Sequence, residues 1–200
     1  MTRTLPSELG NLSSLKLLVL AGTPIATIAI PSEIANLSNM EQLHLVGANF
    51  SDPYWLENAF SAMTNLRTIS ILNSQFNSSG TMVPTIPTEI GLITTLKIIE
   101  VGVTDLKGTL PTELGQLTEL QRLVISGTDL QGTLPTELGL LTDLQTLGIL
   151  KSDITGTIPT ELGLLTKLTR LRMVENRLTG TLPSELDALT RLIDYVPPRE

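Results

Sequence analysis

The sequence predicts an α/β solenoid, in which stacked coils each contribute one strand to a parallel β-sheet and one short helical turn to the opposite side. Three observations predict this fold class: a repeat of 24 residues, a Leu-x-Leu pattern in each copy, and a composition that is 41% hydrophobic but only 3% aromatic. Repeat periods of about 20 to 50 residues are typical of solenoids. Because aromatic residues are rare, the core must consist mainly of Leu and Ile.

Proline residues mark the period. In the second half of the chain each lies 24 residues after the one before it: Pro87, Pro111, Pro135, Pro159 and Pro183. Pro6 and Pro31 mark earlier copies. We therefore predict one domain of about seven to eight repeats over residues 1–192. Residues 193–200 are predicted to be a terminator or a linker, because Tyr195 and Pro197 replace repeat residues and proline interrupts a sheet.

Each copy has the spacing Leu-x-x-Leu-x-x-Leu-x-Leu-x-x-(Asn/Thr)-x-Leu, as in Leu117, Leu120, Leu123, Ile125, Thr128 and Leu130. The Leu-x-Leu pair places two side chains on one face of a strand, and neighbouring strands should lie about 4.8 Å apart. The recurring Pro-Thr-Glu-Leu-Gly segment is predicted to be a single helical turn. We expect its Thr to cap the turn, its Glu to lie near the positive end, and its Gly to end the turn in the left-handed conformation.

These residues resemble the plant-type leucine-rich repeat, Leu-x-x-Leu-x-Leu-x-x-Asn-x-Leu-x-Gly-x-Ile-Pro-x-x-Leu-Gly, from Leu5 to about Leu192. The sequence Gly-Thr-Leu-Pro-Thr-Glu-Leu-Gly-Leu-Leu-Thr is similar to algal versions of the family. The resemblance implies a curved, right-handed leucine-rich-repeat solenoid with a concave parallel sheet, 3-10 turns on the convex side, and a second short strand around Gly-Thr-Leu-Pro. Most relatives are ligand-recognising receptor ectodomains or scaffolds for protein interactions.

One departure concerns the buried Asn ladder of the family, which this chain keeps only at Asn176. The equivalent positions hold mostly hydroxyl residues: Thr23, Ala48, Ser74, Thr104, Thr128 and Ser152. Hydroxyl groups can bond the backbone of neighbouring coils, although with fewer contacts than an amide. We therefore predict a hydroxyl ladder with a gap at Ala48, which water or backbone must fill.

The repeat is irregular between about Asn49 and Thr85, where two insertions lengthen the period. Insertions in solenoids form loops, and loops often carry binding residues. Five of the six aromatic residues lie here: Phe50, Tyr54, Trp55, Phe60 and Phe76. The phenylalanines occupy Leu positions and should be core. Tyr54 and Trp55 occupy no repeat position, so they are predicted to anchor a ligand, or alternatively to pack under the insertion on the convex side.

Outward positions of the predicted strands form columns across the concave sheet and supply the candidate ligand-binding residues: Val19, His44, Val46, Leu72, Ile98, Glu100, Arg122, Val124, Leu150, Arg170, Arg172 and Val174. So many exposed aliphatic residues suit a protein or peptide ligand with few formal charges. The alternative is that scattered surface aliphatics have no function. The three arginines are expected to form a small basic patch, unless Glu100, Glu119 and Glu175 pair with them.

The sequence contains no catalytic or metal-binding constellation, so we expect neither an enzyme nor a cofactor. His44 is the only histidine, the chain has no cysteine, and the recurring Glu residues follow from the repeated turn. A net charge of −7 argues against a nucleic-acid partner. No apolar run approaches the ~20 residues that span a bilayer, so no membrane insertion is expected.

Three functions remain open from the sequence. The first is a protein- or peptide-recognition module, part of a larger receptor-like or scaffold protein, that uses the concave sheet and the 49–85 insertion. The second is ice binding by two stacked threonine ladders, Thr109, Thr133, Thr157 and Thr181 in one, and Thr88, Thr112, Thr136 and Thr160 in the other. The third is a structural subunit of an assembly, with a neighbouring subunit at the N-terminal edge, for which the sequence supplies no cap.

Four glycosylation sequons, at Asn11, Asn36, Asn49 and Asn77, favour an extracellular or lumenal compartment. The lack of cysteine and of a signal-peptide pattern is compatible with the cytoplasm instead. Because the chain opens within a repeat, we expect it to be a fragment of a longer protein.

Overall fold

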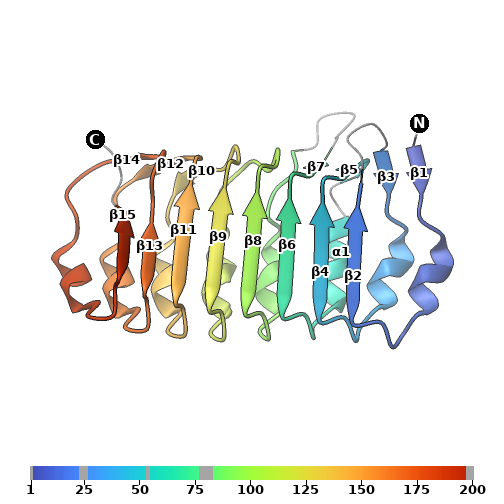
Figure 1. Ribbon diagram of the computed structural model, residues 1–200, viewed down its shortest axis with the longest axis horizontal. Helices are drawn as coiled ribbons and strands as arrows, with labels where there is room; N and C mark the ends of the chain where they lie inside the picture. Colours follow the sequence, from blue (N-terminus) through green and yellow to red (C-terminus); the bar gives the residue numbers. More distant parts are fainter. Residues whose placement is uncertain (1, 23–26, 53–54, 77–82, 197–200) are drawn as a thin grey trace.

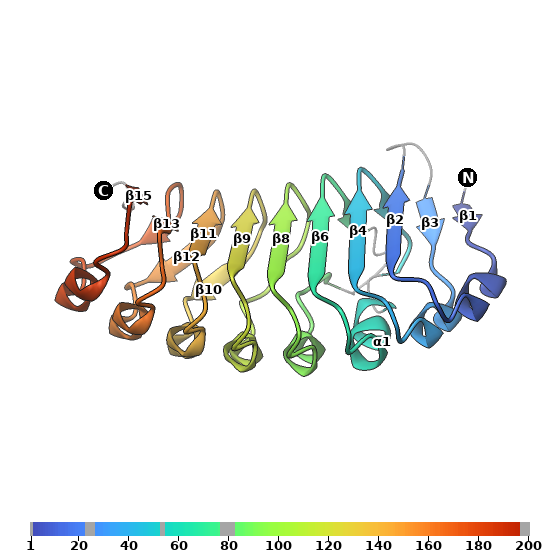
Figure 2. The ribbon, with the colours of Figure 1, turned by 60° about the horizontal axis from the view of Figure 1, so that its bottom comes forward.

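The computed structural model describes residues 2–22, 27–52, 55–76 and 83–196. These residues form a curved solenoid in which one sheet lines one side and helical turns line the other (Figure 1). Figure 2 shows that the helical turns follow the outer, convex side of the arc. The predicted α/β solenoid, with its resemblance to leucine-rich repeats, is confirmed. Within the described part of the chain, every helix is too short or too polar to cross a lipid bilayer.

The concave sheet consists of eight parallel strands in the order β15-β13-β11-β9-β8-β6-β4-β2. Their bounds are β2 (Leu17–Ala21), β4 (Gln42–Val46), β6 (Thr68–Leu72), β8 (Ile98–Gly102), β9 (Arg122–Ser126), β11 (Thr146–Leu150), β13 (Arg170–Arg172) and β15 (Asp194–Val196). The strands pair without any shift in register, because each coil buries the same two Leu-x-Leu side chains and a slip of one residue would expose them. The last strand lies within residues 193–200, so the sheet continues past the predicted domain boundary.

Seven 3-10 turns and one α-helix form the convex side. They are η1 (Ser7–Asn11), η2 (Ser32–Asn36), α1 (Trp55–Ala62), η3 (Thr88–Leu92), η4 (Thr112–Gln116), η5 (Thr136–Leu140), η6 (Thr160–Leu164) and η7 (Ser184–Ala188). Proline and not threonine is the N-cap residue of each 3-10 turn, so the predicted Thr cap is wrong. The Thr hydroxyl instead donates to the carboxylate of the next residue, as Thr112 does to Glu113 at 3.3 Å.

The glycine of each turn has a different role from the one predicted. A Cβ atom on Gly139 would lie 2.6 Å from the carbonyl oxygen of Glu161 in the next coil, and Gly91, Gly115 and Gly163 are similarly crowded. The left-handed glycines are elsewhere, for example Gly132 and Gly156. Glycine in the turn therefore permits close stacking of coils and does not end the turn. In η7 the equivalent position is the exposed Asp187.

Two shorter parallel sheets run between the concave sheet and the turns. The first contains β1 (Thr2–Thr4), β3 (Thr27–Ala29), β5 (Asn49–Phe50) and β7 (Gln75–Phe76), and the second contains β10 (Gln131–Thr133), β12 (Asp153–Gly156) and β14 (Arg177–Leu178). Between them only a single bridge is described, from Thr85 to Lys107. Between these two sheets, the Asp105 carboxylate accepts a hydrogen bond from the backbone N–H of Phe76 at 2.8 Å. The carboxylate takes the place of a backbone carbonyl acceptor.

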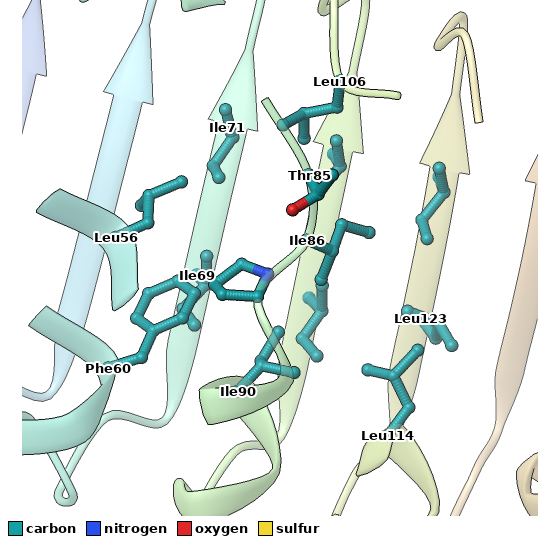
Figure 3. A pocket seen from close by; sticks show the side chains of 14 residues that line it. Leu56, Phe60, Ile69, Ile71, Thr85, Ile86, Ile90, Leu106, Leu114 and Leu123 are labelled. Carbon is teal, nitrogen blue, oxygen red and sulfur yellow. The ribbon is translucent and has the colours of Figure 1, made fainter. Parts of the chain in front are cut away.

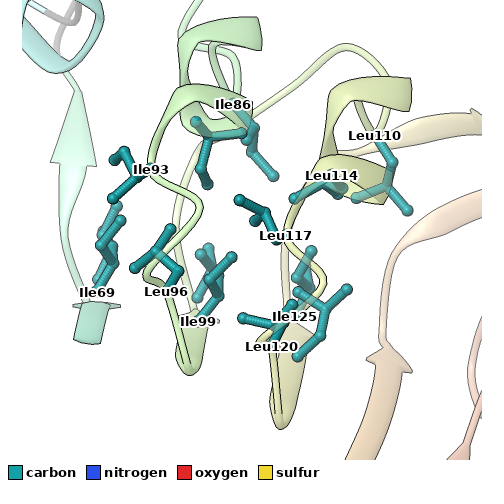
Figure 4. Close-up of a cluster of buried hydrophobic side chains, with 14 of the residues drawn as sticks. Ile69, Ile86, Ile93, Leu96, Ile99, Leu110, Leu114, Leu117, Leu120 and Ile125 are labelled. Atoms are coloured by element: carbon teal, nitrogen blue, oxygen red, sulfur yellow. The ribbon is translucent and has the colours of Figure 1, made fainter. Parts of the chain in front are cut away.

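The core is a continuous stack of aliphatic layers, one per coil (Figure 4). Leu117, Leu120, Leu123 and Ile125 of one coil are fully buried, and the same positions recur in its neighbours. Each such side chain contributes roughly 1.5–3 kcal/mol of burial energy. Because every layer contacts only the adjacent layers, stability depends on contacts between successive coils.

The predicted hydroxyl ladder is present in part, because the buried Thr104 hydroxyl has no hydrogen-bond partner among the described residues. Ser74, Thr104, Thr128 and Ser152 are buried, and the hydroxyls of Thr128 and Ser152 lie 2.9 Å apart. At the predicted gap the backbone N–H of Ala48 lies 3.4 Å from the Ser74 hydroxyl, so a neighbouring side chain fills the position. Asn176 donates its amide to the carbonyl oxygen of Ile149 at 2.6 Å.

The irregular stretch is built around helix α1 and three stacked aromatic residues. Phe50, Phe60 and Phe76 are buried, as predicted. The Phe50 ring lies 5.4 Å from that of Phe76 and 5.6 Å from that of Trp55. Residues 77–82 of the second insertion lie outside the described residues.

Candidate binding surface

The outward positions of the concave sheet form the columns that the repeat predicts. Strand pairing aligns Val19 with His44, His44 with Ser70, Ser70 with Glu100, and so on through Val124, Gly148 and Arg172. The next column aligns Ala21, Val46, Leu72, Gly102, Ser126 and Leu150. All the concave-face candidates except Val174, which follows the end of β13, therefore lie in strands of one sheet.

Aliphatic side chains dominate this surface, and most are half-buried. Val46, Leu72, Ile98, Val124, Leu150 and Val174 keep part of their area exposed, and Val19 is 52% exposed. The site of a Cβ atom on Gly148 lies 3.1 Å from Leu150 and 3.6 Å from Val124, so these two side chains meet over the glycine. The result is a shallow apolar patch near the middle of the C-terminal half.

The predicted basic patch is mostly neutralised. Arg122 forms an ion pair with Glu100 at 2.5 Å, as the alternative reading expected, and Arg172 pairs with Asp194 at 2.5 Å. Glu175 lies 4.0 Å from Lys151. Arg170 is exposed and forms no ion pair with the residues that the structure describes. These pairs cross between adjacent coils and contribute little stability where they face water.

His44 is half-buried, and its Nε2 lies 3.5 Å from the Gln42 amide oxygen. Among the described residues no three His, Asp or Glu side chains gather in a way that could hold a metal ion. His44 is therefore one polar residue among the aliphatic and charged residues of the concave sheet.

Trp55, one of the two aromatic residues predicted to anchor a ligand, is buried. Trp55 is the first residue of α1 and is only 4% exposed, because it packs beside Phe50 in the core. This corresponds to the packing alternative. Tyr54 lies outside the described residues. We therefore leave Trp55 out of the candidate binding surface.

Both threonine ladders lie on the surface, and all eight side chains are exposed. In the first ladder each methyl group covers a glycine of the next coil: a Cβ atom on Gly156 would lie 2.9 Å from the Thr133 methyl, and Gly132 and Gly180 face Thr109 and Thr157 in the same way. In the second ladder each hydroxyl faces its neighbouring Glu. Both ladders thus have a local structural role.

The sequons differ in accessibility. Asn11 and Asn36 are exposed at the ends of η1 and η2. Asn49 is only 9% exposed in β5, where it pairs with the flanking strands, so the folded chain does not present this amide for glycosylation. Asn77 lies outside the described residues.

An interior cavity beside α1 is too small for a small-molecule ligand. A cavity of about 20 Å³ lies between α1, β6 and η3 and is lined almost entirely by aliphatic side chains (Figure 3). Apolar cavities of this size stay dry and are far smaller than the ~150 Å³ that benzene occupies in a protein core.

Sequence reasoning missed the residues that directly precede the strands. Lys16, Glu41 and Arg67 line a polar groove across the first coils, each directly before the start of a strand, β2, β4 and β6 respectively. Lys16 forms an ion pair with Glu41 at 2.7 Å. The hydrogen bond from Lys16, together with its charge, holds the pKa of the Glu41 carboxyl below its usual value. Each of these residues directly precedes a Leu-x-Leu strand in the sequence, and this shared position could have identified them.

A stack of parallel strands and 3-10 turns with an exposed concave sheet defines a repeat-type, non-catalytic binding module. The Leucine Rich Repeat family matches residues 167–189, and no curated protein matches the chain. The chain therefore has the fold of a leucine-rich-repeat solenoid, and solved structures show that it is similar to plant receptor ectodomains.

Three of these structures illustrate the similarity. The plant peptide hormone receptor RGFR1, in complex with RGF2, has 30% identity and a TM-score of 0.85 over 100% of this chain. The ectodomain of the receptor kinase GASSHO1/SCHENGEN3 from Arabidopsis thaliana, with CASPARIAN STRIP INTEGRITY FACTOR 2, has 27% identity and a TM-score of 0.80 over 98%. The Arabidopsis receptor kinase HAESA, with the peptide hormone IDA and the co-receptor SERK1, has 26% identity and a TM-score of 0.80 over 96%. The chain spans 30%, 23% and 31% of them, respectively.

Proposed function

We propose that this domain recognises a protein or peptide through its concave sheet, as part of a receptor-like or scaffold protein. The observation that carries the proposal is the apolar patch formed by Val124 and Leu150 over Gly148, in a sheet whose other outward columns are also partly aliphatic. Half-buried apolar side chains are typical of the centre of a binding site. The peptide-hormone complexes of similar ectodomains support this proposal.

Curvature and rigidity also favour recognition. Eight strands in strict register hold the outward columns at fixed spacing, so a ligand meets a preformed surface and loses less free energy on binding. Within residues 49–85, Trp55 does not contribute to this surface because it is packed in the core, whereas Leu72 lies on the concave sheet.

The test is a pair of double variants that add the same charges to opposite sides of the solenoid. Val124→Asp with Leu150→Asp changes the concave patch, whereas Leu140→Asp with Leu164→Asp changes two aliphatic residues that are 55% and 59% exposed at the ends of the convex turns. Each protein is used for affinity capture from the native source, and captured partners are identified by mass spectrometry. Binding of a partner should fall about tenfold or more in the concave variant only.

Circular dichroism and thermal unfolding of both variants establish that they remain folded. A partner that is retained equally by the wild type and by the folded concave variant would contradict the proposal.

Ice binding is a second candidate, favoured by the exposure of the threonines in both ladders. Its test is direct, because ice adsorption produces thermal hysteresis and inhibits recrystallisation. Absence of both effects at high protein concentration would exclude it.

A further inference from the structure

Charge is distributed unevenly between the two sides of the solenoid. The seven 3-10 turns and α1 carry nine acidic residues and no Lys or Arg. The pKa of the Glu57 carboxyl in α1 is raised by burial and further by the negative charges of Glu89 and Asp52, which reflects this crowding of acidic groups.

The concave side has the opposite sign. Its strands and the residue directly before each strand contain three acidic residues, Glu41, Glu100 and Asp194, against six basic residues: Lys16, Arg67, Lys97, Arg122, Arg170 and Arg172. A protein with a net charge of −7 thus presents a positive concave face. Such a field attracts anionic partners to this face and steers their approach.

Three ion pairs neutralise half of these cations, and two of the remaining three, Arg67 and Lys97, lie at the starts of adjacent strands, whereas Arg170 lies in β13. Lys16 is paired with Glu41, Arg122 with Glu100, and Arg172 with Asp194. Arg67 and Lys97 form no ion pair with any residue that the structure describes. They begin adjacent strands, since the carbonyl oxygen of Arg67 accepts the N–H of Lys97 at 2.9 Å. Two like charges about one strand spacing apart repel each other, and a bound anion would relieve that repulsion.

Hydrogen bonds fix the polar side chains that line the groove beside Arg67 and Lys97. Asn39 and Asn65 donate their side-chain amides to the carbonyl oxygens of Ser13 and Ser38 in the preceding coils, both at 2.8 Å. Thr95 donates to the carbonyl oxygen of Leu66 at 2.7 Å. All three line the same polar groove as Arg67. Because these hydrogen bonds already order the groove beside Arg67, a ligand need not order it on binding.

We infer that the groove at the start of β2, β4, β6 and β8 binds an acidic segment of the partner, with Arg67 and Lys97 as the paired cations that hold its carboxylates. The inference rests on the proposed function and names the charge of the ligand. It differs from the expectation of a ligand with few formal charges. The guanidinium of Arg67 can hold one carboxylate by two parallel hydrogen bonds, and the Lys97 ammonium can hold a second.

A peptide fits these observations better than a nucleic acid. Only two unpaired cations meet at the groove, and Glu41 and the acidic convex side repel an extended polyanion. Nucleic-acid affinity requires many phosphate contacts, whereas a short acidic peptide requires two or three.

The experiment measures fluorescence anisotropy of a short labelled peptide in which Glu alternates with Gly, against the same peptide with Gln in place of Glu. The Glu peptide should bind at low ionic strength about tenfold or more tightly than the Gln peptide, and its affinity should fall with added salt. Arg67→Glu with Lys97→Glu should remove binding, and the neutral pair Arg67→Gln with Lys97→Gln should weaken it. The control Lys107→Glu makes the same charge change at an exposed lysine near the smaller sheets and should leave the Glu peptide bound.

Equal affinity for both peptides, or undiminished binding by the folded Arg67 and Lys97 variants, would overturn the inference. So would tighter binding of a single-stranded oligonucleotide that depends on the same two residues. If the Val124 and Leu150 variant loses a captured partner while the Glu peptide does not bind, the proposed function stands and the acidic-ligand inference fails.

Discussion

At the scale of single residues, Trp55 illustrates how position decides the role of an aromatic side chain. Its residue type suits a binding anchor, yet α1 turns it inward beside Phe50, and its indole Nε1 has no hydrogen-bond partner among the described residues. Trp55 therefore stabilises the domain through packing alone. Sequence reasoning could place Phe50, Phe60 and Phe76 in the core because they replace Leu, but it had no repeat position by which to orient Trp55.

Replacement of Trp55 by Ala should lower the free energy of unfolding by about 3–5 kcal/mol, because it leaves a large cavity beside two aromatic rings. Trp55→Phe should cost much less, since no hydrogen bond is lost. Equilibrium denaturation measures both values. Leu164→Ala, at a position 59% exposed, is the control and should change stability little. A Trp55→Ala protein with unchanged stability but weaker partner binding would restore the anchor hypothesis.

At the scale of elements, the strands could be predicted from the sequence and the turns only in part. Leu123 and Ile125 are buried because the Leu-x-Leu pattern alternates with the pleat of the strand, and the same argument aligned the outward columns. The N-cap residues of the turns could not be predicted from residue preference. The N-cap of η4 is Pro111, whose extended conformation, φ −69° and ψ 138°, is the one that starts the turn. The role of Gly139 depends on the neighbouring coil, which local sequence does not describe.

Gly139→Ala should destabilise the domain by about 1–3 kcal/mol, because the new methyl group would overlap the Glu161 carbonyl and force two coils apart. Asp187→Ala, at the same position of the last turn, provides a matched control and should change stability little. Thermal and denaturant unfolding report the difference. Equal effects of the two substitutions would mean that helix propensity, and not the stacking of coils, decides the residue at this position.

At the scale of the whole molecule, stability should be greatest in the middle of the array. Leu123 and Ile125 in β9 are completely buried by coils on both sides, whereas Leu18 and Leu20 in the edge strand β2 each keep 8% of their surface exposed. Amide hydrogen exchange should therefore be slower in β8 and β9 than in β2 and β15. Uniform protection of all eight strands would indicate a single cooperative unit and contradict a description by neighbouring-coil contacts.

The candidate site could be recognised only from the complete fold. The sequence yields the outward columns, but the neutralisation of Arg122 and Arg172 depends on side chains from adjacent coils. The pairing of Arg67 with Lys97 across a gap of 30 residues is likewise visible only once the irregular stretch has been folded into the stack. Long-range register, more than residue type, decides which charges are left for a ligand.

Repeat arrays have two complementary ends, and copies that add head to tail can grow into open filaments. In this domain the aspartate at position 187 places a carboxylate where an incoming coil of the same geometry would bring its backbone carbonyl. Electrostatic repulsion and steric overlap at that one position oppose such growth from the η7 end. Asp187 thus disfavours the stacking of a further coil of the same geometry on η7 and leaves the concave sheet unchanged.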